Sequence, residues 1–244
     1  MNLLLKEWLK DEPFTLTLSS GFFGFFAHTG FLAALEEEDL KPTLVTGSSA
    51  GALAGGSWAA GVSAEDIRKD LFSLTKEEFW DPGIGPGLLK GDLFKNRLEK
   101  LLPVKNMNET KIPFKASAFD FFGQRTKVLD TGDLSKVIRA SCAVPFLFQP
   151  VWIEKKPYLD GGIRDRPALD GVPANNRVLY HHLISNSWWR FHSKECTRFP
   201  IRENMHTIAI KNLPKMGPNK LANGEKAYQK AYTETKKLLN LQMK

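Results

Sequence analysis

The sequence predicts an α/β protein whose central sheet is mainly parallel. Residues 14–18 alternate in a β-rich pattern, a glycine-containing loop follows, and residues 25–37 have the pattern of a helix. A second apolar strand ends near Val45, and a helix of small residues follows it. Strand, loop, helix, strand, turn and helix in this order are typical of the βαβ unit, which builds parallel sheets.

The rest of the chain continues to alternate between strand and helix patterns. Ser63 and the acidic residues after it are a helix N-cap signature. The Gly- and Pro-rich residues 80–87 predict a surface loop or lid. Further elements are expected as helices at 3–10, 67–73, 91–102, 134–141 and 223–242, a β-hairpin at 114–122 and 126–129, and strands at 177–183 and 205–210.

The composition indicates a soluble globular protein. At 244 residues the chain is long enough for one large domain, or for one domain with an appendage. No apolar run approaches the roughly 18 residues of a membrane span, and residues 1–9 are too short and interrupted for a signal peptide. Cys142 and Cys196 form neither a disulfide framework nor a zinc spacing, so we expect an intracellular, cytoplasmic protein.

The formal net charge of +7 is concentrated at the C-terminus. Residues 211–244 contain eight lysines and two glutamates, which gives +6 and leaves +1 for the rest of the chain. Such a tail would contribute about 1 kcal/mol per lysine near an anionic membrane, although a solvated helix face is the simpler interpretation. Nucleic-acid binding is a third interpretation, but we do not expect it because the chain has no recognised motif for it.

Residues 47–51 fit the Gly-x-Ser-x-Gly pattern, which holds a serine on a tight turn between a strand and a helix. Ser49 is the candidate nucleophile. Gly47 and Gly51 leave room where two backbones approach each other. The helix that begins beside Ser49 directs unpaired N–H groups and its positive dipole end towards a developing oxyanion. The alternative is a helix start rich in small residues that carries no chemistry.

A serine hydroxyl needs a base within hydrogen-bond reach. Asp160 ends an apolar segment and is followed by Gly161 and Gly162, which allow close backbone approach, so it is the candidate base. The alternative for these three residues is an ordinary turn. Four histidines also follow in the order that a Ser-Asp-His triad requires, which keeps an α/β-hydrolase-type esterase open as an alternative: His181, His182, His192 and His206.

The loop after the first predicted strand is the candidate oxyanion hole. Backbone N–H groups on a glycine loop at a helix N-terminus can bind an oxyanion, and here they belong to Ser20, Gly21 and Phe22. The alternative is an ordinary turn between strand and helix. Phenylalanines close to this loop are candidates for an acyl pocket, with core packing as the alternative: Phe22, Phe23, Phe25 and Phe26.

Together these segments resemble the patatin-like phospholipases. The glycine loop, the motif His28–Leu32, the Gly47–Gly51 turn, the segment Ala140–Pro145 with Pro150, and Asp160–Gly162 occur in the family's order. The resemblance implies a three-layer α/β/α patatin-like fold with a mainly parallel central sheet. It also implies a catalytic domain at 14–177 and, by extension, a C-terminal segment at 178–244 that packs on the same domain and ends in the lysine-rich helix.

The family's chemistry is carried over by position. The resemblance implies a Ser-Asp dyad, with Ser49 as the nucleophile that accepts the acyl group and Asp160 as its base. It places the amides of Ser20, Gly21 and Phe22 at the oxyanion. The motif glycines are Gly24, Gly47, Gly51, Gly161 and Gly162. The implied reaction is hydrolysis of carboxylic esters in lipids of the phospholipase A or lysophospholipase type, with no metal or organic cofactor.

One departure from the family pattern lies in the oxyanion loop. Phe23 stands where many members have an arginine, and the spacing to His28 is one residue longer. Backbone donors survive this change, but the arginine charge does not. A weakly active or inactive lipid-binding homologue is therefore an alternative, and a thioesterase or an acyltransferase would use the same acyl-serine. We expect His28 and Asp120 to be structural.

Two further expectations concern charged and aromatic residues. Asp165 is expected to pair with Arg164 or Arg166. The aromatic and basic residues at 188–191 and 198–199 have the composition of a segment at the headgroup level of a bilayer, which with the lysine tail indicates peripheral membrane contact.

Overall fold

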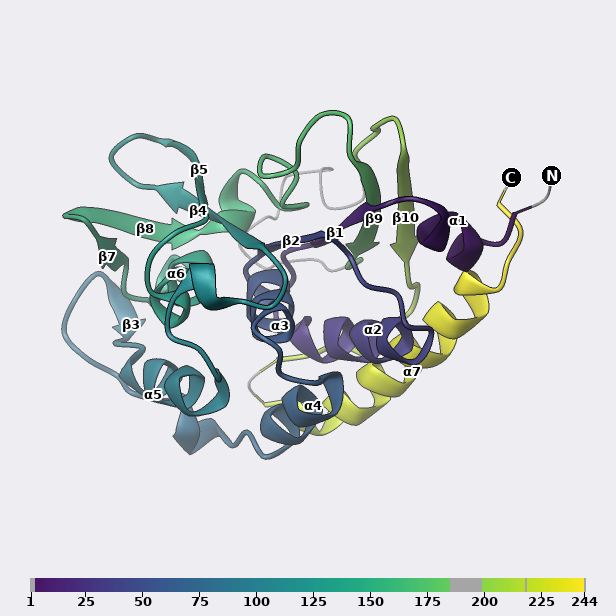
Figure 1. Ribbon diagram of the computed structural model, residues 1–244. Coiled ribbons are helices and arrows are strands. Elements are labelled where there is room, and N and C mark those ends of the chain that lie inside the picture. Colours follow the sequence, from purple (N-terminus) through teal and green to yellow (C-terminus); the bar gives the residue numbers. More distant parts are fainter. Residues whose placement is uncertain (1–2, 185–198, 218, 244) are drawn as a thin grey trace.

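A mixed sheet forms the centre of the computed structural model, which describes residues 3–184, 199–217 and 219–243 (Figure 1). Its parallel strands are β1 (Phe14–Leu18), β2 (Leu44–Ser48), β4 (Phe114–Asp120), β9 (Arg177–His182) and β10 (Met205–Ala209). Antiparallel pairing adds β5 (Arg125–Leu129), β7 (Val151–Ile153) and β8 (Lys156–Asp160). The strand order is β10-β9-β1-β2-β4-β8-β7, with β5 paired to β4. The predicted α/β fold with a mainly parallel sheet is therefore confirmed.

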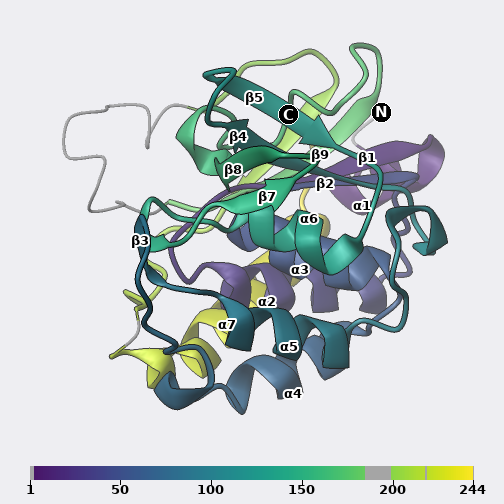
Figure 2. The same cartoon turned by 90° about the vertical axis from the view of Figure 1, so that its left-hand side faces the viewer.

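Most of the helices lie on one face of this sheet (Figure 2). The helices nearest the sheet are α2 (Phe25–Glu37), α3 (Ala50–Ala59) and α6 (Leu134–Ser141), and farther from it lie α4 (Ala64–Phe72), α5 (Asp92–Leu101) and α7 (Gly224–Leu239). The short α1 (Leu5–Asp11) lies near the C-terminal end of α7, where the Leu5 amide donates to the Leu241 carbonyl at 3.0 Å. Among the described residues no helix combines the length and the apolar character that crossing a membrane requires.

Several elements have the bounds that the sequence indicates. The helices at 25–37 and 134–141 are confirmed, and the segment after β4 returns as the expected antiparallel hairpin. Ser63 is the N-cap of α4 and accepts a hydrogen bond from the Asp66 amide at 3.1 Å. A second, two-stranded sheet of β3 (Gly87–Leu89) and β6 (Phe146–Phe148) was not predicted. Each of its strands has three residues and directly follows a proline, so neither shows a strand pattern.

Both faces of the main sheet are covered, and successive side chains alternate between them. On the helical face the backbone of Leu18 lies against Gly51 of α3. On the opposite face the Thr17 hydroxyl donates to the Pro167 carbonyl at 2.8 Å. The segment 161–176 thus covers the second face and provides acceptors for its buried hydroxyl groups.

Strands β2 and β8 share one edge of β4, because β5 occupies the other edge along Ala116–Asp120. On the shared edge Ser117 pairs with Ser48 of β2, and the next residue, Ala118, pairs with Asp160 of β8. Since β2 is parallel and β8 antiparallel to β4, the carboxyl ends of β2 and β8 meet. This topology brings the turn after Ser48 beside the turn after Asp160.

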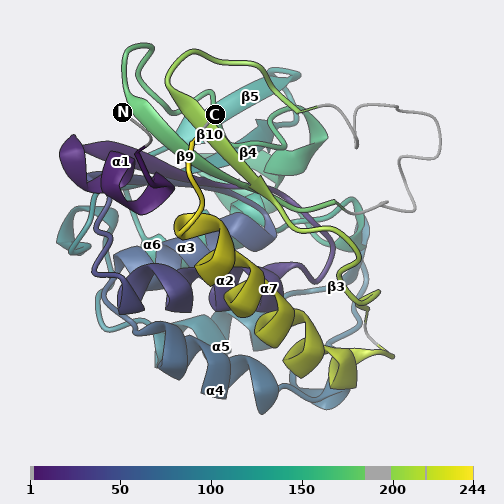
Figure 3. The same cartoon turned by 90° about the vertical axis from the view of Figure 1, so that its right-hand side faces the viewer.

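Backbone pairing and helix packing join the C-terminal segment to the rest of the fold. β9 pairs with β1 along the whole length of β1. α7 lies across α2 (Figure 3), where a Cβ atom on Gly30 would be 2.2 Å from the Tyr228 carbonyl oxygen. Lys236 forms ion pairs with Glu37 and Glu38 of 2.9 and 2.6 Å. At least one of the α7 lysines, Lys236, is therefore paired with acidic residues inside the fold.

Candidate active site

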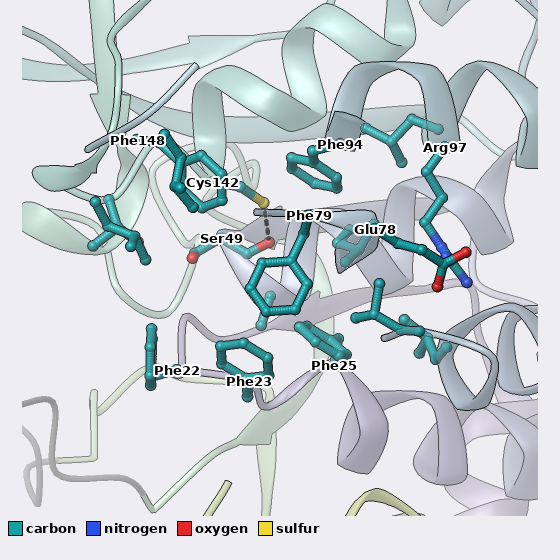
Figure 4. A pocket seen from close by; sticks show the side chains of 18 of the residues that line it. Phe22, Phe23, Phe25, Ser49, Glu78, Phe79, Phe94, Arg97, Cys142 and Phe148 are labelled. Carbon is teal, nitrogen blue, oxygen red and sulfur yellow. Dashed lines mark hydrogen bonds and ion pairs between the residues drawn. The ribbon is translucent and has the colours of Figure 1, made fainter. Parts of the chain in front are cut away.

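Ser49 lies on the turn between β2 and α3 with backbone angles of φ 52° and ψ −116°. A positive φ is uncommon outside glycine and persists only where the surroundings hold it. Two residues at the end of α6 do so: the Ser49 amide donates to the Ser141 hydroxyl at 2.9 Å, and the Cys142 thiol donates to the Ser49 carbonyl at 3.2 Å (Figure 4). Ser141 donates in turn to the Ser117 carbonyl at 2.7 Å, which ties the turn to β4.

Gly47 and Gly51 allow this turn to pack against its neighbours. A Cβ atom on Gly51 would lie 2.0 Å from the carbonyl oxygen of Leu18 in β1. A Cβ atom on Gly47 would lie 2.5 Å from the Gly51 carbonyl oxygen. α3 consequently begins directly against the sheet, and the N–H groups of its first turn lie beside Ser49.

Asp160 ends β8 and is 2% exposed. Its amide donates to the Ala143 carbonyl at 2.9 Å, and its Oδ1 accepts a hydrogen bond from the Gly162 amide at 2.7 Å. Burial raises the pKa of the Cys142 thiol, and the nearby charge of Asp160 raises it further. The thiol therefore stays protonated and able to donate to the Ser49 carbonyl, which places Asp160, Cys142 and Ser49 in one local network.

The glycines after Asp160 bring its turn against two other segments. A Cβ atom on Gly161 would lie 2.9 Å from the Ser48 hydroxyl oxygen, and one on Gly162 would lie 2.2 Å from the Ser20 hydroxyl oxygen. The turn after Asp160 therefore lies between the β2 end and the loop 19–24.

The loop 19–24 differs in one respect from the sequence expectation. The Ser20 amide donates to the Arg166 carbonyl at 2.8 Å, so this amide is used within the protein and is not available to an oxyanion. Within the described part of the chain the Gly21 amide makes no hydrogen bond, and its carbonyl accepts from the Gly24 amide at 2.9 Å. The expected donor set is thereby revised from three amides to those of Gly21 and Phe22.

Arg166 is a buried residue whose role was not predicted. Its Nε donates to the Ser20 carbonyl at 3.3 Å, and its Nη2 donates to the Leu183 carbonyl. The guanidinium thus joins the loop 19–24 to the end of β9. The only signal in the sequence is an arginine six residues after Asp160, and no sequence pattern indicates that it bonds to the Ser20 and Leu183 carbonyls.

Asp165 forms an ion pair with neither Arg164 nor Arg166, contrary to expectation. Its carboxylate accepts from the Ser117 hydroxyl at 2.5 Å and from the amides of Leu169 and Asp170 at 3.0 and 3.1 Å. Burial raises its pKa. Asp165 therefore fixes the segment 165–170 against β4. Asp120 is likewise structural, because its Oδ1 accepts from the Gly123 amide in the hairpin turn.

Among the described histidines, none lines the pocket at Ser49. His28 and His181 are fully buried and joined Nδ1 to Nδ1 at 2.9 Å, and His28 Nε2 lies 2.8 Å from the Ser19 carbonyl oxygen. A carbonyl only accepts, so His28 carries its proton on Nε2 and His181 carries its proton on Nδ1. Burial lowers the pKa of His28 to about 4, and it lowers the pKa of His181 as well. His28 is thus structural, as expected, and supports Ser19.

The other triad candidates are His182, His192 and His206. His182 Nδ1 is 2.7 Å from the Tyr180 hydroxyl. His206 belongs to β10, the last strand of the sheet order, with β9 and β1 between it and β2. His192 lies outside the described residues, as do residues 188–191. No described histidine therefore has the contacts with Asp160 and Ser49 that a triad needs.

A large apolar pocket opens above Ser49. Its empty space, including the open mouth, is about 1080 Å³. Ser49 and Cys142 lie at one end and Arg97 at the other, with phenylalanines from several segments between them (Figure 4). Arg97 forms ion pairs with Asp70 at 3.0 Å and Glu78 at 3.1 Å, so the charges at the far end are paired. The apolar lining comes from these residues: Phe22, Phe23, Phe25, Leu53, Leu71, Leu74, Phe79, Trp80, Leu89, Phe94, Leu98, Leu101, Val144, Leu147 and Phe148.

The phenylalanines in the loop 19–24 and directly after it fall into two groups. Phe22, Phe23 and Phe25 line the pocket, as expected for an acyl site. Phe26 is instead a core residue, 1% exposed and stacked on Phe72 at 5.7 Å between ring centroids.

Residues 16–172 match the family model of the patatin-like phospholipases. This chain belongs to that family. Uncharacterized NTE family proteins of Mycobacterium bovis and Mycobacterium tuberculosis are 31% identical to it over 167 residues. The aligned region covers 67% of this chain and 46% of each relative, so the chain spans about half the length of the curated relatives that it matches.

Solved structures show the same fold at low sequence identity. VipD from Legionella pneumophila has a TM-score of 0.66 at 17% identity, covering 93% of this chain and 67% of that protein. ExoU in its complex with SpcU from Pseudomonas aeruginosa has a TM-score of 0.51 at 16% identity, covering 93% of this chain and 51% of that one. Since 93% of this chain is covered in both cases, the similarity extends beyond the family match into the segment after residue 172.

Proposed function

We propose that this family member is a serine lipid acyl hydrolase, of the phospholipase A or lysophospholipase type, that cleaves carboxylic esters through an acyl-Ser49 intermediate. The observation that carries the proposal is a serine with positive φ at one end of a large apolar pocket, beside a buried aspartate on a converging strand. Backbone strain of this kind is typical of a nucleophile held ready for attack. Family membership supports the same class of reaction.

In the proposed cycle Asp160 takes the proton of the Ser49 hydroxyl while the hydroxyl oxygen attacks the ester carbonyl. The amides of Gly21 and Phe22 stabilise the tetrahedral oxyanion. When the intermediate collapses, the ester C–O bond breaks and the leaving alcohol takes the proton from Asp160. A water molecule that Asp160 deprotonates then attacks the acyl-serine. The bond between Ser49 Oγ and the acyl carbon breaks, Ser49 Oγ takes the proton back from Asp160, and the fatty acid leaves.

The pocket supports a lipid as the substrate. Its phenylalanine and leucine lining matches a hydrocarbon chain, and its charged residues at the far end are already paired with one another. An acyl chain therefore fits between Ser49 and Arg97 without leaving a buried charge unpaired. Detection of free fatty acid as the product separates hydrolysis from acyl transfer to another acceptor.

The test is a hydrolysis panel of phosphatidylcholine, lysophosphatidylcholine, acylglycerols and a short p-nitrophenyl ester. We expect Ser49→Ala and Asp160→Asn each to lower kcat by about 10³-fold or more, because they remove the nucleophile and its base. Ser57→Ala is the matched control: this serine is also buried, lies farther along α3 and does not line the pocket, so its loss should change kcat by less than about threefold.

Histidine variants test the alternative triad. We expect His182→Asn, His192→Ala and His206→Ala to keep activity within about tenfold of wild type. Circular dichroism and thermal melts confirm that each variant is folded. A folded histidine variant as inactive as Ser49→Ala would overturn the dyad. A folded wild-type chain that binds lipid but releases no fatty acid from any substrate would support the inactive homologue instead.

A further inference from the structure

The small sheet of β3 and β6 separates the acyl pocket from solvent and has an apolar surface on both sides. We call residues 80–90 together with residues 146–148 the flap. On its inner side Leu89 is fully buried, and it lines the pocket together with Phe148. Leu88 alternates with Leu89 along β3, so it points away from the pocket, and it is 47% exposed. Phe146, at the start of β6, pairs with Gly87 and is 79% exposed. Lining the pocket therefore does not explain why these two exposed positions are apolar.

The exposed side chains of the flap are held in place by the backbone. The Lys90 amide donates to the Asp81 carbonyl at 3.0 Å, and the Gly83 amide donates to the Leu88 carbonyl at 3.1 Å, so the loop folds back on β3. Ile84 at the tip is fully exposed, and its carbonyl accepts a hydrogen bond from Gln149 at 3.1 Å. An ordered segment thus directs an isoleucine side chain into solvent.

Phe146 adds a second sign that exposure is built into the flap. Its φ is 65°, in the left-handed region that a bulky residue rarely adopts. A conformation of this kind costs on the order of 1–3 kcal/mol and is usually found where a function requires it. Here it holds an aromatic ring outwards beside the mouth of an apolar pocket.

The charges near the flap do not favour a strongly anionic partner. Near the flap the four acidic residues Glu77, Glu78, Asp81 and Asp92 are balanced by four basic ones, Lys76 and Lys90 in the same stretch, Arg97 paired with Glu78, and Arg139 near Asp81 and Asp92. Lys76 lies over the Trp80 ring at 4.8 Å from its centroid. The Asp81 carboxylate accepts hydrogen bonds from the amides at the start of α5. Contact through this surface would therefore depend on apolar burial and not on charge attraction.

The last turn of the lysine-rich α7 lies apart from the flap. In Figure 1 β3 is at the left of the molecule and the C-terminal end of α7 is at the right, whereas the N-terminal end of α7 reaches the same margin as β3 in Figure 3. Lys236, in the last turn of α7, is paired with Glu37 and Glu38.

We propose that the outer side of the flap inserts into the surface of a zwitterionic phospholipid bilayer, with Ile84, Leu88 and Phe146 as anchors. Docking there brings the pocket mouth to the headgroup level, from which an acyl chain can enter without crossing water. An exposed apolar patch beside a ligand pocket is typical of an interaction site. The proposed function supplies the reason for docking, whereas vesicle binding itself can be measured without catalysis.

Flotation with phosphatidylcholine vesicles tests the proposal, using the chain with Ser49→Ala so that no lipid is consumed. We expect this chain to float with the vesicles, and adding salt to 0.5 M to change the bound fraction by less than about twofold. Ile84→Asp or Phe146→Asp should each weaken binding by about tenfold or more, because each places a charge where an apolar side chain would enter the bilayer. Ile201→Asp is the matched control, because Ile201 is equally exposed but lies outside the flap, and it should leave binding unchanged.

Hydrolysis of a water-soluble p-nitrophenyl ester by the flap variants without Ser49→Ala shows that they remain folded and active. Equal flotation of the flap variants and the parent chain would overturn the proposal. So would binding that requires anionic lipid and disappears in salt, or self-association that Ile84→Asp abolishes in a chain that does not float. If the chain floats as expected but hydrolyses no ester, the flap proposal stands and the proposed function fails. If it hydrolyses soluble ester but does not float, the reverse holds.

Discussion

The Ser49 turn and the loop 19–24 meet at the same pocket but are held in place in different ways. The turn can be recognised from its own sequence, because Gly47 and Gly51 permit its close packing, and Ser141 and Cys142 of the α6 end add two hydrogen bonds to Ser49. The loop depends on distant residues: Arg166 donates to its Ser20 carbonyl, and His28 supports its Ser19 carbonyl.

This difference separates a local motif from a tertiary one. A local motif can be recognised in a sequence, whereas the supports of the loop are spread over more than one hundred residues of chain, from Ser20 to Arg166. The two regions are expected to respond differently to substitution. Changes in the turn should affect folding, and changes in the supports of the loop should affect pH dependence and turnover.

The largest effect is expected at Gly51. Gly51→Ala places a Cβ atom 2.0 Å from the Leu18 carbonyl oxygen, and this oxygen belongs to β1 backbone that packing holds in place. We expect the free energy of unfolding to fall by about 4 kcal/mol or more, measured by urea denaturation. In the control Gly132→Ala the methyl group meets nothing within 4 Å, and only the φ of 96° opposes it, so a loss of about 1–2 kcal/mol is expected. Equal losses in the two variants would contradict the account of the turn.

A smaller effect is expected from the His28–His181 pair as the pH falls. The unfolded chain takes up protons on these histidines below about pH 6.5, whereas burial lowers the folded pKa of His28 to about 4. The unfolded state then binds more protons, so stability is complete above pH 6.5 and decreases towards pH 4. The loss for His28 alone is about 3 kcal/mol.

Urea denaturation between pH 7.5 and 4.5 measures this loss. We expect the decrease to be clearly smaller in a folded His28→Gln variant, which removes one titrating group of the pair. Surface carboxylates contribute equally in both proteins, so the comparison isolates the histidine. Parallel stability curves for wild type and variant would show that the pair is not responsible.

The third effect concerns turnover more than stability. Arg166→Met keeps the length of the side chain but removes the donors to the Ser20 and Leu183 carbonyls. We expect kcat to fall by about 10- to 100-fold because the Gly21 amide is displaced from the oxyanion, with KM for the short p-nitrophenyl ester nearly unchanged. Arg164→Met is the control, since Arg164 is exposed and lies over the Phe119 ring at 5.9 Å. If both variants turn over like wild type, Arg166 does not position the loop.

The sequence predicts the helices, strands and turns of this protein better than the tertiary contacts that hold them in place. The strand–turn–helix at Ser49 and the helix at 25–37 follow from local patterns, and both are present. The partner of the Ser20 amide does not follow, because a backbone contact with Arg166 has no local signal. The expected ion pair of Asp165 was wrong for the same reason: the carboxylate is used by Ser117 on β4, which lies far away in the chain.

The pocket shows the same limit. Four phenylalanines lie within five residues, two in the loop 19–24 and two at the start of α2. In α2 neighbouring side chains point in different directions, so Phe26 is in the core and Phe25 lines the pocket. Of the flap, residues 80–87 were expected as a surface loop or lid, but the small sheet was not, because β3 and β6 are short and their pairing joins segments almost sixty residues apart. Structure that forms within one segment is thus predictable from the sequence, whereas structure that needs contact between two distant segments is not.

The central claim is that Ser49 is the nucleophile of a pocket built for an acyl chain. Labelling with an activated fluorophosphonate, followed by peptide mass spectrometry, tests it most directly, since only an activated serine reacts readily. We expect one label, on Ser49, that is absent in Ser49→Ala and strongly reduced in Asp160→Asn. A label on Ser48 or another residue, or no label on a folded chain, would contradict it.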